Sequence, residues 1–150
     1  AIALSRQKVP YINPKNSKEN KCEKGAYVVN LTSHESNVTL VASGTEVELA
    51  LKVQDKLKEN NIHSKVVSMP CMELFDKQPE DYRKDILEEN SLIITLEAGS
   101  VMSWQKYIKN KGANLGIDKF GESAPYKEVY KHFKLSEEDI TNFIQKKLRK

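Results

Sequence analysis

The chain has 150 residues, of which 39% are apolar, and this is enough for one domain with a hydrophobic core. Charged residues make up 30% of the chain, but the net charge is only +3, so the strong basic excess of a nucleic-acid-binding surface is missing. No apolar stretch approaches the ~20 residues that a membrane-spanning helix needs, and the first residues do not resemble a signal peptide. We therefore expect a soluble, cytoplasmic protein that binds neither nucleic acid nor membranes.

The first 24 residues differ in composition from the rest. The chain opens without Met on an apolar run, residues 1–4, which is followed by Ser5 and Arg6. Residues 8–24 contain two Pro and five Lys but few apolar side chains, which is typical of an exposed connector. We interpret residues 1–24 as the end of a preceding domain plus a linker, and residues 25–150 as a second domain. The chain is thus expected to be a piece of a longer protein.

From residue 25 onwards, predicted strands alternate with predicted helices. Continuous apolar runs of the kind buried in parallel sheets predict three central strands, at residues 38–42, 63–69 and 92–96. Two shorter strands are expected at residues 26–30 and 113–117. Helical spacing of apolar residues predicts helices at residues 45–59, 79–87, 101–108, 125–133 and from 136 onwards. The fold class is therefore α/β: a three-layer α/β/α arrangement around a mostly parallel sheet of about five strands, of which the short strand at 26–30 could run antiparallel.

Several helix starts carry recognisable signals. Thr45 and Glu48 have the three-residue spacing of a capping box at the start of the helix over residues 45–59. Pro79 and Pro125 stand where two shorter helices would begin. Ser136 is expected to cap the last helix.

Two helices near the C-terminus are expected to bury apolar side chains. The helix over residues 125–133 would direct Val129, Tyr130 and Phe133 inwards. The helix after Ser136 has one apolar stripe, formed by Ile140, Phe143, Ile144 and Leu148.

The cysteines and histidines form no recognisable metal or redox motif. Cys22 and Cys71 lie far apart and lack the CxxC or Cys/His spacing of a zinc site. His34, His63 and His132 share no ligand spacing, and no Ser, His and acidic residue together have the signature of a nucleophile elbow. We therefore expect two reduced thiols, no metal site and no catalytic residue in this chain.

Polar residues follow two of the central strands. The turn at residues 43–45 joins a strand to a helix, where free N–H groups could hold a phosphate, but its single Gly lacks the known phosphate-binding patterns. Glu97 ends the strand at residues 92–96, on the edge where open α/β sheets bind ligands. A helix cap at the turn and a carboxylate hydrogen-bonded to backbone are the simpler interpretations.

Seven segments, read in order, resemble the C-terminal domain of transketolase. Their order and spacing cover nearly the whole chain, and the last segment is the most distinctive. The segments are residues 4–7 (LSRQ), 25–28 (GAYV), 40–47 (LVASGTEV), 66–70 (VVSMP), 75–78 (FDKQ), 82–83 (YR) and 116–125 (GIDKFGESAP).

The resemblance implies a fragment of a homodimeric enzyme that transfers a two-carbon ketol unit from a ketose phosphate to an aldose phosphate in the pentose phosphate pathway. That family uses thiamine diphosphate and a divalent metal, Mg²⁺ or Ca²⁺, held between two other domains. This chain has no GDG-type motif for them, so we expect it to bind neither and to be inactive alone. Arg6 is the one family site that maps here, and it would contact the terminal phosphate of the substrate. Without the resemblance, Arg6 would be read as a surface residue at a strand end.

Two other functions are considered. A small regulatory module could bind an anion or a nucleotide near residues 43–45 and Glu97. A purely interface-forming domain would use the loop over residues 116–125, which would expose Phe120. Loop packing within the monomer is an equally good account of that segment.

Overall fold

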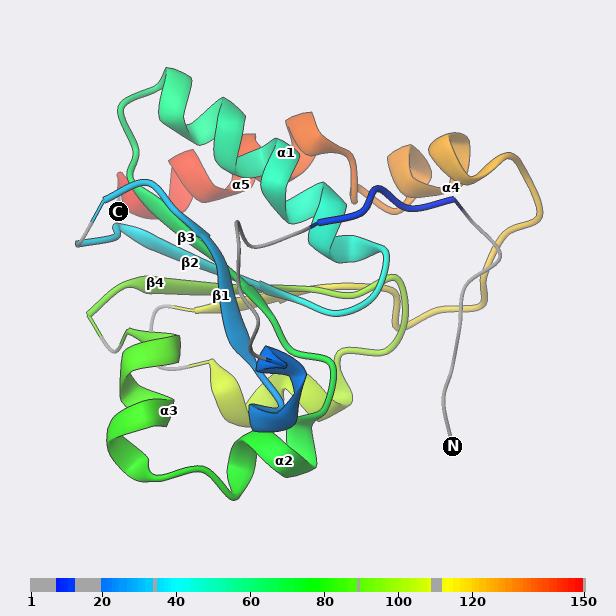
Figure 1. Ribbon diagram of the computed structural model, residues 1–150. Helices are drawn as coiled ribbons and strands as arrows, with labels where there is room; N and C mark the ends of the chain where they lie inside the picture. Colours follow the sequence, from blue (N-terminus) through cyan, green and yellow to red (C-terminus); the bar gives the residue numbers. More distant parts are fainter. Residues whose placement is uncertain (1–7, 13–19, 34, 89, 109–111, 150) are drawn as a thin grey trace.

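The computed structural model describes residues 8–12, 20–33, 35–88, 90–108 and 112–149. Within these residues the chain forms one five-stranded sheet with the order β1-β3-β2-β4-β5. Its strands are β1 (Tyr27–Leu31), β2 (Val38–Ala42), β3 (Ser64–Ser68), β4 (Leu92–Leu96) and β5 (Ala113–Leu115). β1 runs antiparallel to β3 and the other three pairs are parallel, so the expected mostly parallel sheet is confirmed (Figure 1).

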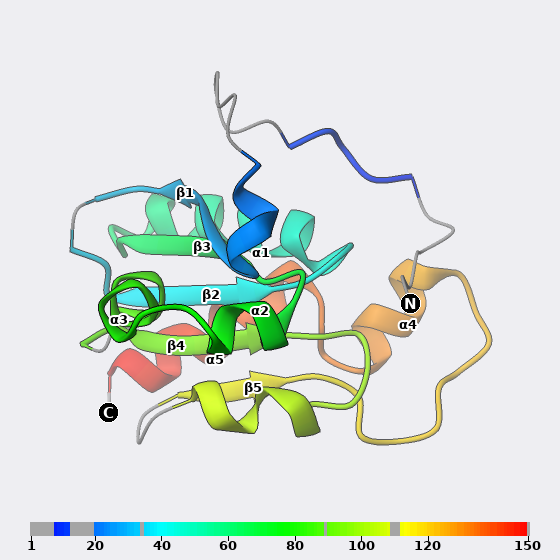
Figure 2. The same cartoon turned by 60° about the horizontal axis from the view of Figure 1, so that its bottom comes forward.

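Helices lie on both faces of the sheet. One face carries α1 (Glu46–Glu59) and α5 (Glu137–Leu148), with α4 (Tyr126–His132) beside them (Figure 1). The other face carries α2 (Met72–Asp76), α3 (Glu80–Leu87) and the 3-10 helix η2 (Met102–Tyr107) (Figure 2). This is the three-layer architecture that the alternation of strands and helices predicted.

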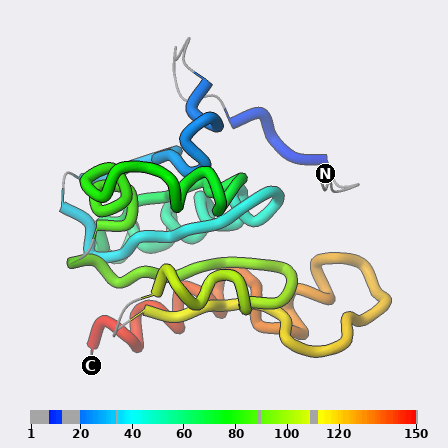
Figure 3. The backbone as a smooth tube through the Cα atoms, turned by 90° about the horizontal axis from the view of Figure 1, so that it is seen from below, coloured from blue at the N-terminus to red at the C-terminus, as the bar shows by residue number. Residues whose placement is uncertain are grey.

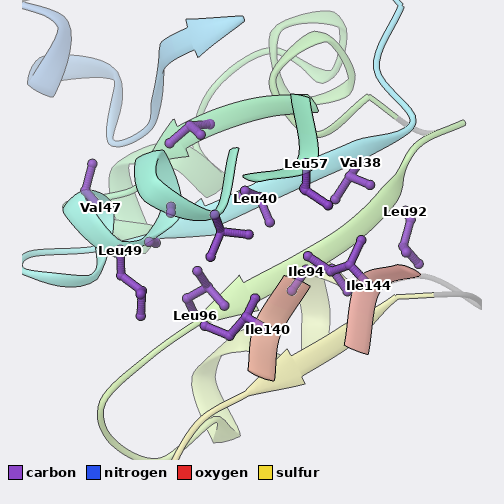
Figure 4. Close-up of a cluster of buried hydrophobic side chains, with 14 residues drawn as sticks. Val38, Leu40, Val47, Leu49, Leu57, Leu92, Ile94, Leu96, Ile140 and Ile144 are labelled. Carbon is purple, nitrogen blue, oxygen red and sulfur yellow. The ribbon is translucent and has the colours of Figure 1, made fainter. Parts of the chain in front are cut away.

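The central strands are buried on both faces, which explains their continuous apolar sequences. Every residue of β2 and β4 is buried. On the α1 side, Leu40, Ile94 and Leu96 pack with Ile140 and Ile144 of α5 (Figure 4). Full burial of each such side chain contributes about 1.5–3 kcal/mol. The core on the other face consists of Ala26, Val41, Val67, Met69, Phe75, Ile86, Ile93, Trp104 and Tyr107.

The capping box expected at the start of α1 does not form. Thr45 already has helical backbone angles (φ −66°, ψ −27°), whereas a capping residue has an extended backbone. Its hydroxyl therefore donates to Glu46 Oε1, 2.6 Å away, and Glu48 pairs with Lys52 instead. The cap at Ser136 is confirmed, because its side chain accepts a hydrogen bond from the backbone N–H of Asp139.

The helix α4 is less buried than expected. None of its residues is buried, and Val129, Tyr130 and Phe133 are only partly covered. The reason is its position, since α4 and the loop before it extend past the carboxyl ends of the strands (Figure 3). In α5, Ile140 and Ile144 are buried as expected, whereas Leu148 is 39% exposed at the helix end.

Three short helical elements differ from the prediction. Residues 102–107 form a 3-10 helix, in which Trp104 and Tyr107 at i and i+3 share one buried side. Two elements were not predicted, namely α2 and η1 (Lys21–Lys24), and η1 lies within the expected connector. Gly25 ends η1 with φ +81°, and a Cβ atom there would lie 2.3 Å from Phe75 N, so only Gly fits.

Residues 8–12 have no regular structure, in keeping with a connector, but Ile12 packs against the core on the α1 side. Among the described residues, no helix is both long and apolar enough to cross a membrane. The division into residues 1–24 and 25–150 stays a prediction.

Candidate functional site

The turn after β2 and the residue after β4 meet at the carboxyl edge of the sheet. Ala42 and Leu96, the last residues of these parallel strands, are paired in register. Ser43 Oγ consequently lies 3.5 Å from Glu97 Oε2. The two stretches that sequence reasoning singled out are therefore brought together.

The structure adds two residues that the sequence did not single out. Glu46 is the first residue of α1 and is only 5% exposed. Tyr130 reaches this edge from α4 and donates a hydrogen bond to Glu46 Oε1, at 2.5 Å. Glu46 could have been predicted from its place directly after a strand-to-helix turn. The capping-box spacing of Thr45 and Glu48 favoured Glu48 instead. Tyr130 was expected only as an inward-facing residue of its helix, because nothing but the position of α4 relative to the sheet brings it to this edge.

The carboxylate of Glu97 was expected to accept hydrogen bonds from the backbone, but it accepts them from side chains. Trp104 Nε1 donates to Glu97 Oε2 over 3.1 Å. Burial raises the pKa of Glu97, and the negative charge of Glu46 raises it further, whereas the hydrogen bonds from Trp104 and Ser43 act in the opposite direction. Burial, followed by the hydrogen bond to Glu46, also raises the pKa of Tyr130 well above its ordinary value. This edge is therefore a half-buried site with two neighbouring carboxylates.

Both carboxylates line a pocket of about 570 Å³. Its other wall comes from α4 and the loop before it, including Gly121, Glu122 and Tyr126. A phosphate or nucleotide placed here would face two carboxylates at close range, so the geometry does not favour the anion-binding alternative. Thiamine diphosphate fits poorly for the same reason. The described residues also contain no group of three or more His, Cys, Asp or Glu that could hold a metal ion.

None of the described residues among the other candidates, the cysteines, histidines and methionines, lines this pocket. Arg6 and His34 fall outside the described residues, so the role predicted for Arg6 stays a prediction. Cys22 and Cys71 are free thiols, the first exposed and the second partly buried. Met69 is 1% exposed and belongs to the core.

A second polar cluster lies at the amino edge of the sheet. The side chain of Lys65 on β3 is 6% exposed, and its Nζ lies 2.9 Å from Glu88 Oε2. The same Nζ donates to the Asp85 carbonyl oxygen over 2.6 Å. Glu88 Oε1 accepts from the backbone N–H of Ser36 at 2.8 Å. These bonds tie the end of α3 to the sheet, and we assign them a structural role.

The comparisons with known proteins agree with the fold. The family model described as "Transketolase-like TK C-terminal domain" matches residues 25–136. The chain belongs to this family. A chloroplastic transketolase from Solanum tuberosum is 37% identical over 142 residues, which are 93% of this chain and 19% of that protein. The transketolase from Bacillus subtilis is 38% identical over 154 aligned positions, covering 100% of this chain and 23% of the relative.

Solved transketolase structures superimpose well on this domain. A variant from Pichia stipitis gives a TM-score of 0.85 with 30% identity, over 96% of this chain and 20% of that one. The transketolase from Leishmania mexicana gives 0.76 with 35% identity, over 85% of this chain and 18% of that one. This transketolase C-terminal domain thus spans about a fifth of the length of its relatives.

Proposed function

We propose that this chain is the C-terminal part of a transketolase. In this proposal the full-length protein transfers a two-carbon ketol unit from a ketose phosphate to an aldose phosphate, acts in the cytoplasm and forms a homodimer. The single observation that carries it is the family match over residues 25–136, and the relatives that extend this match across the chain are themselves named transketolases. Some of these relatives are named chloroplastic, so the cellular location needs its own measurement.

The cofactors are assigned to other domains of the full-length protein. Thiamine diphosphate would supply the carbanion chemistry of ketol transfer, and a divalent metal would hold its diphosphate. The acidic carboxyl edge of this domain argues against the diphosphate binding here, and the described residues contain no group of three or more His, Cys, Asp or Glu that could hold the metal ion. The domain is therefore proposed to be inactive by itself and to serve as a structural unit that contributes to the dimer.

Residues 1–24 are proposed to be the end of the catalytic domain plus a linker, with Arg6 in the active site of the full-length enzyme. A guanidinium group suits a terminal phosphate, because its planar fork can donate two parallel, charge-assisted hydrogen bonds. Arg6 would position the substrate and would transfer no proton.

Steady-state kinetics of the full-length enzyme test this role. Arg6→Ala should raise KM for a phosphorylated ketose by about 10- to 150-fold, which corresponds to the ~1.5–3 kcal/mol of a charged hydrogen bond. An unphosphorylated ketose should be affected far less. Lys8→Ala removes a cation two positions further along the same segment and should leave both KM values unchanged.

Three results would argue against the proposal. Equal effects of Arg6→Ala on both ketoses would remove the phosphate contact. Ketol transfer by the 150-residue chain alone would contradict the proposal that this domain is inactive by itself. A full-length protein without ketol transfer in the presence of thiamine diphosphate and Mg²⁺ would refute the function itself.

A further inference from the structure

Two carboxylates lie at the carboxyl edge of the sheet, and no cation of the described residues is paired with them. Glu46 and Glu97 both line the pocket described above, and the negative charge of Glu46 raises the pKa of Glu97. Among the described residues, no Lys or Arg forms an ion pair with either carboxylate. Buried charges in proteins are normally paired, so two uncompensated carboxylates at one edge need an explanation.

Each carboxylate has one occupied oxygen and one that remains available. Glu46 Oε1 accepts from Thr45 Oγ1 and Tyr130, and Glu97 Oε2 accepts from Trp104 and Ser43. No described residue donates to Glu46 Oε2 or to Glu97 Oε1. These bonds hold the two side chains in place while leaving one acceptor on each, so the acceptors are positioned in advance for an incoming donor.

The surroundings of the pocket suit a protein segment rather than a small molecule. Every residue from 118 to 128 is exposed, and Phe120, next to the pocket residue Gly121, is 99% exposed. Tyr126 lines the pocket and is 49% exposed. Large apolar side chains beside a polar pocket are typical of the centre of a protein interface, where aromatic residues are enriched.

We infer that this carboxyl edge is a docking site for an Arg or Lys side chain carried by the preceding, catalytic part of the same polypeptide. The inference rests on the proposed function, because it requires the remaining four fifths of a full-length transketolase. The cationic head would bridge Glu46 and Glu97, and its aliphatic stem would lie against Phe120 and Tyr126. The docked cation supplies the positive charge that the described residues do not place at this edge.

The same geometry speaks against a bound metal ion. Two carboxylates, each already bound through one oxygen, provide fewer ligands than Mg²⁺ or Ca²⁺ requires. Glu122 lines the same pocket but is exposed, and the described residues contain no group of three or more His, Cys, Asp or Glu that could hold a metal ion. A guanidinium fork, by contrast, can donate to one oxygen of each carboxylate at the same time.

The test compares one substitution in two contexts. In the 150-residue chain, Glu97→Gln removes an unfavourable, half-buried charge while its amide oxygen can still accept from Trp104, so Tm should rise by roughly 2–4 °C. In the full-length protein the same substitution removes half of the cation site, so Tm of this domain should fall by a similar amount. The effect of Glu97→Gln should thus change sign between the two contexts.

Glu122→Gln is the matched control, because Glu122 is an exposed carboxylate that lines the same pocket. It should shift Tm by less than about 1 °C in both contexts. Glu46→Gln is the second variant and should repeat the change of sign if Glu97→Gln does not fold. A shift of the same sign in both contexts overturns the inference. The melting curves do not depend on activity, so this result and a failure of the proposed function are separable.

A titration of the 150-residue chain provides an independent measurement. Trp104 is the only Trp in the sequence and contacts Glu97, so its fluorescence reports on the pocket. N-acetylarginine amide at millimolar concentration should give a saturable change that Glu97→Gln abolishes, and uncharged N-acetylcitrulline amide should give none. The inference is overturned if N-acetylarginine amide has no saturable effect, or if Mg²⁺ alone produces it.

Discussion

The ion pair between the buried Lys65 and Glu88 allows a direct test of how burial affects the contribution of an ion pair to the free energy of unfolding. The perturbation is Lys65→Met, which keeps an unbranched side chain of similar length but removes the charge. It takes away the partner of Glu88 Oε2 and the donor to the Asp85 carbonyl oxygen. Both effects destabilise the attachment of α3 to the sheet.

The expected magnitude follows from distance and burial. Two unit charges 2.9 Å apart attract each other by about 6 kcal/mol at an effective dielectric constant of about 20. Desolvation of both ions offsets most of that attraction, whereas removing one partner leaves the other uncompensated at a cost of ~3–5 kcal/mol. The Glu88 side chain is 23% exposed and keeps the N–H of Ser36, so it retains part of its solvation. We expect Lys65→Met to lower the free energy of unfolding by about 3 kcal/mol.

Urea denaturation followed by circular dichroism measures this change in the 150-residue chain. The control is Lys52→Met, since Lys52 Nζ lies 2.8 Å from Glu48 Oε1 but its side chain is 49% exposed. Exposed pairs of this kind contribute at most ~1 kcal/mol, and usually less. The double variant Lys65→Met/Glu88→Gln should recover part of the lost stability, because it removes the charge that was left unpaired.

The reasoning would be refuted by equal losses for Lys65→Met and Lys52→Met. Distance alone would then set the contribution of an ion pair in this domain, and burial would have no part in it. A double variant less stable than Lys65→Met would also contradict it, because Glu88 would then stabilise the domain without its cation.

Three further predictions concern the cap of α5, a glycine and the acidic edge. Ser136→Ala should lower the free energy of unfolding by about 1 kcal/mol in urea denaturation, whereas Ser136→Asp should not. Gly116→Ala should lower the free energy of unfolding by ~1–3 kcal/mol, because its Cβ would lie 2.3 Å from Val101 Cγ1. Gly121→Ala should be nearly neutral, because no atom lies within 4 Å of the added Cβ. Equal losses of stability in thermal melts would contradict this. The folded-state pKa of Glu97 is raised, so the folded state binds more protons and stability should fall as pH rises from about 4.3 through that raised pKa. Glu97→Gln should remove this slope from urea midpoints measured against pH, and an unchanged slope would be evidence against the raised pKa.

Much of the fold follows from local patterns in the sequence. The apolar runs at residues 38–42 and 92–96 predicted central strands because a strand buried on both faces needs apolar side chains at every position. Ser136 marked the start of α5 because its side chain satisfies a free N–H within its own helix. Such signals are local, so they can be read without knowing what packs against them.

The short elements were decided by tertiary contacts. The six residues of η2 form a 3-10 helix that places Trp104 and Tyr107 against one core, and their spacing alone also fits an α-helix. The helix α4 carries apolar residues, yet it lies past the strand ends, where no sheet covers it. Periodicity shows that a helix has an apolar side but does not show which surface, if any, will cover it.

The sequence by itself determined the α/β class, the central strands, the family resemblance and the position of Glu97 at a carboxyl edge. Only the tertiary structure decided that Glu46 and Tyr130 join Glu97 there, because Tyr130 and Glu46 are 84 positions apart in the chain. Their meeting depends on the parallel register of β2 and β4 and on the placement of α4. Local patterns specify which elements form, whereas the charge of a site depends on which distant elements come together.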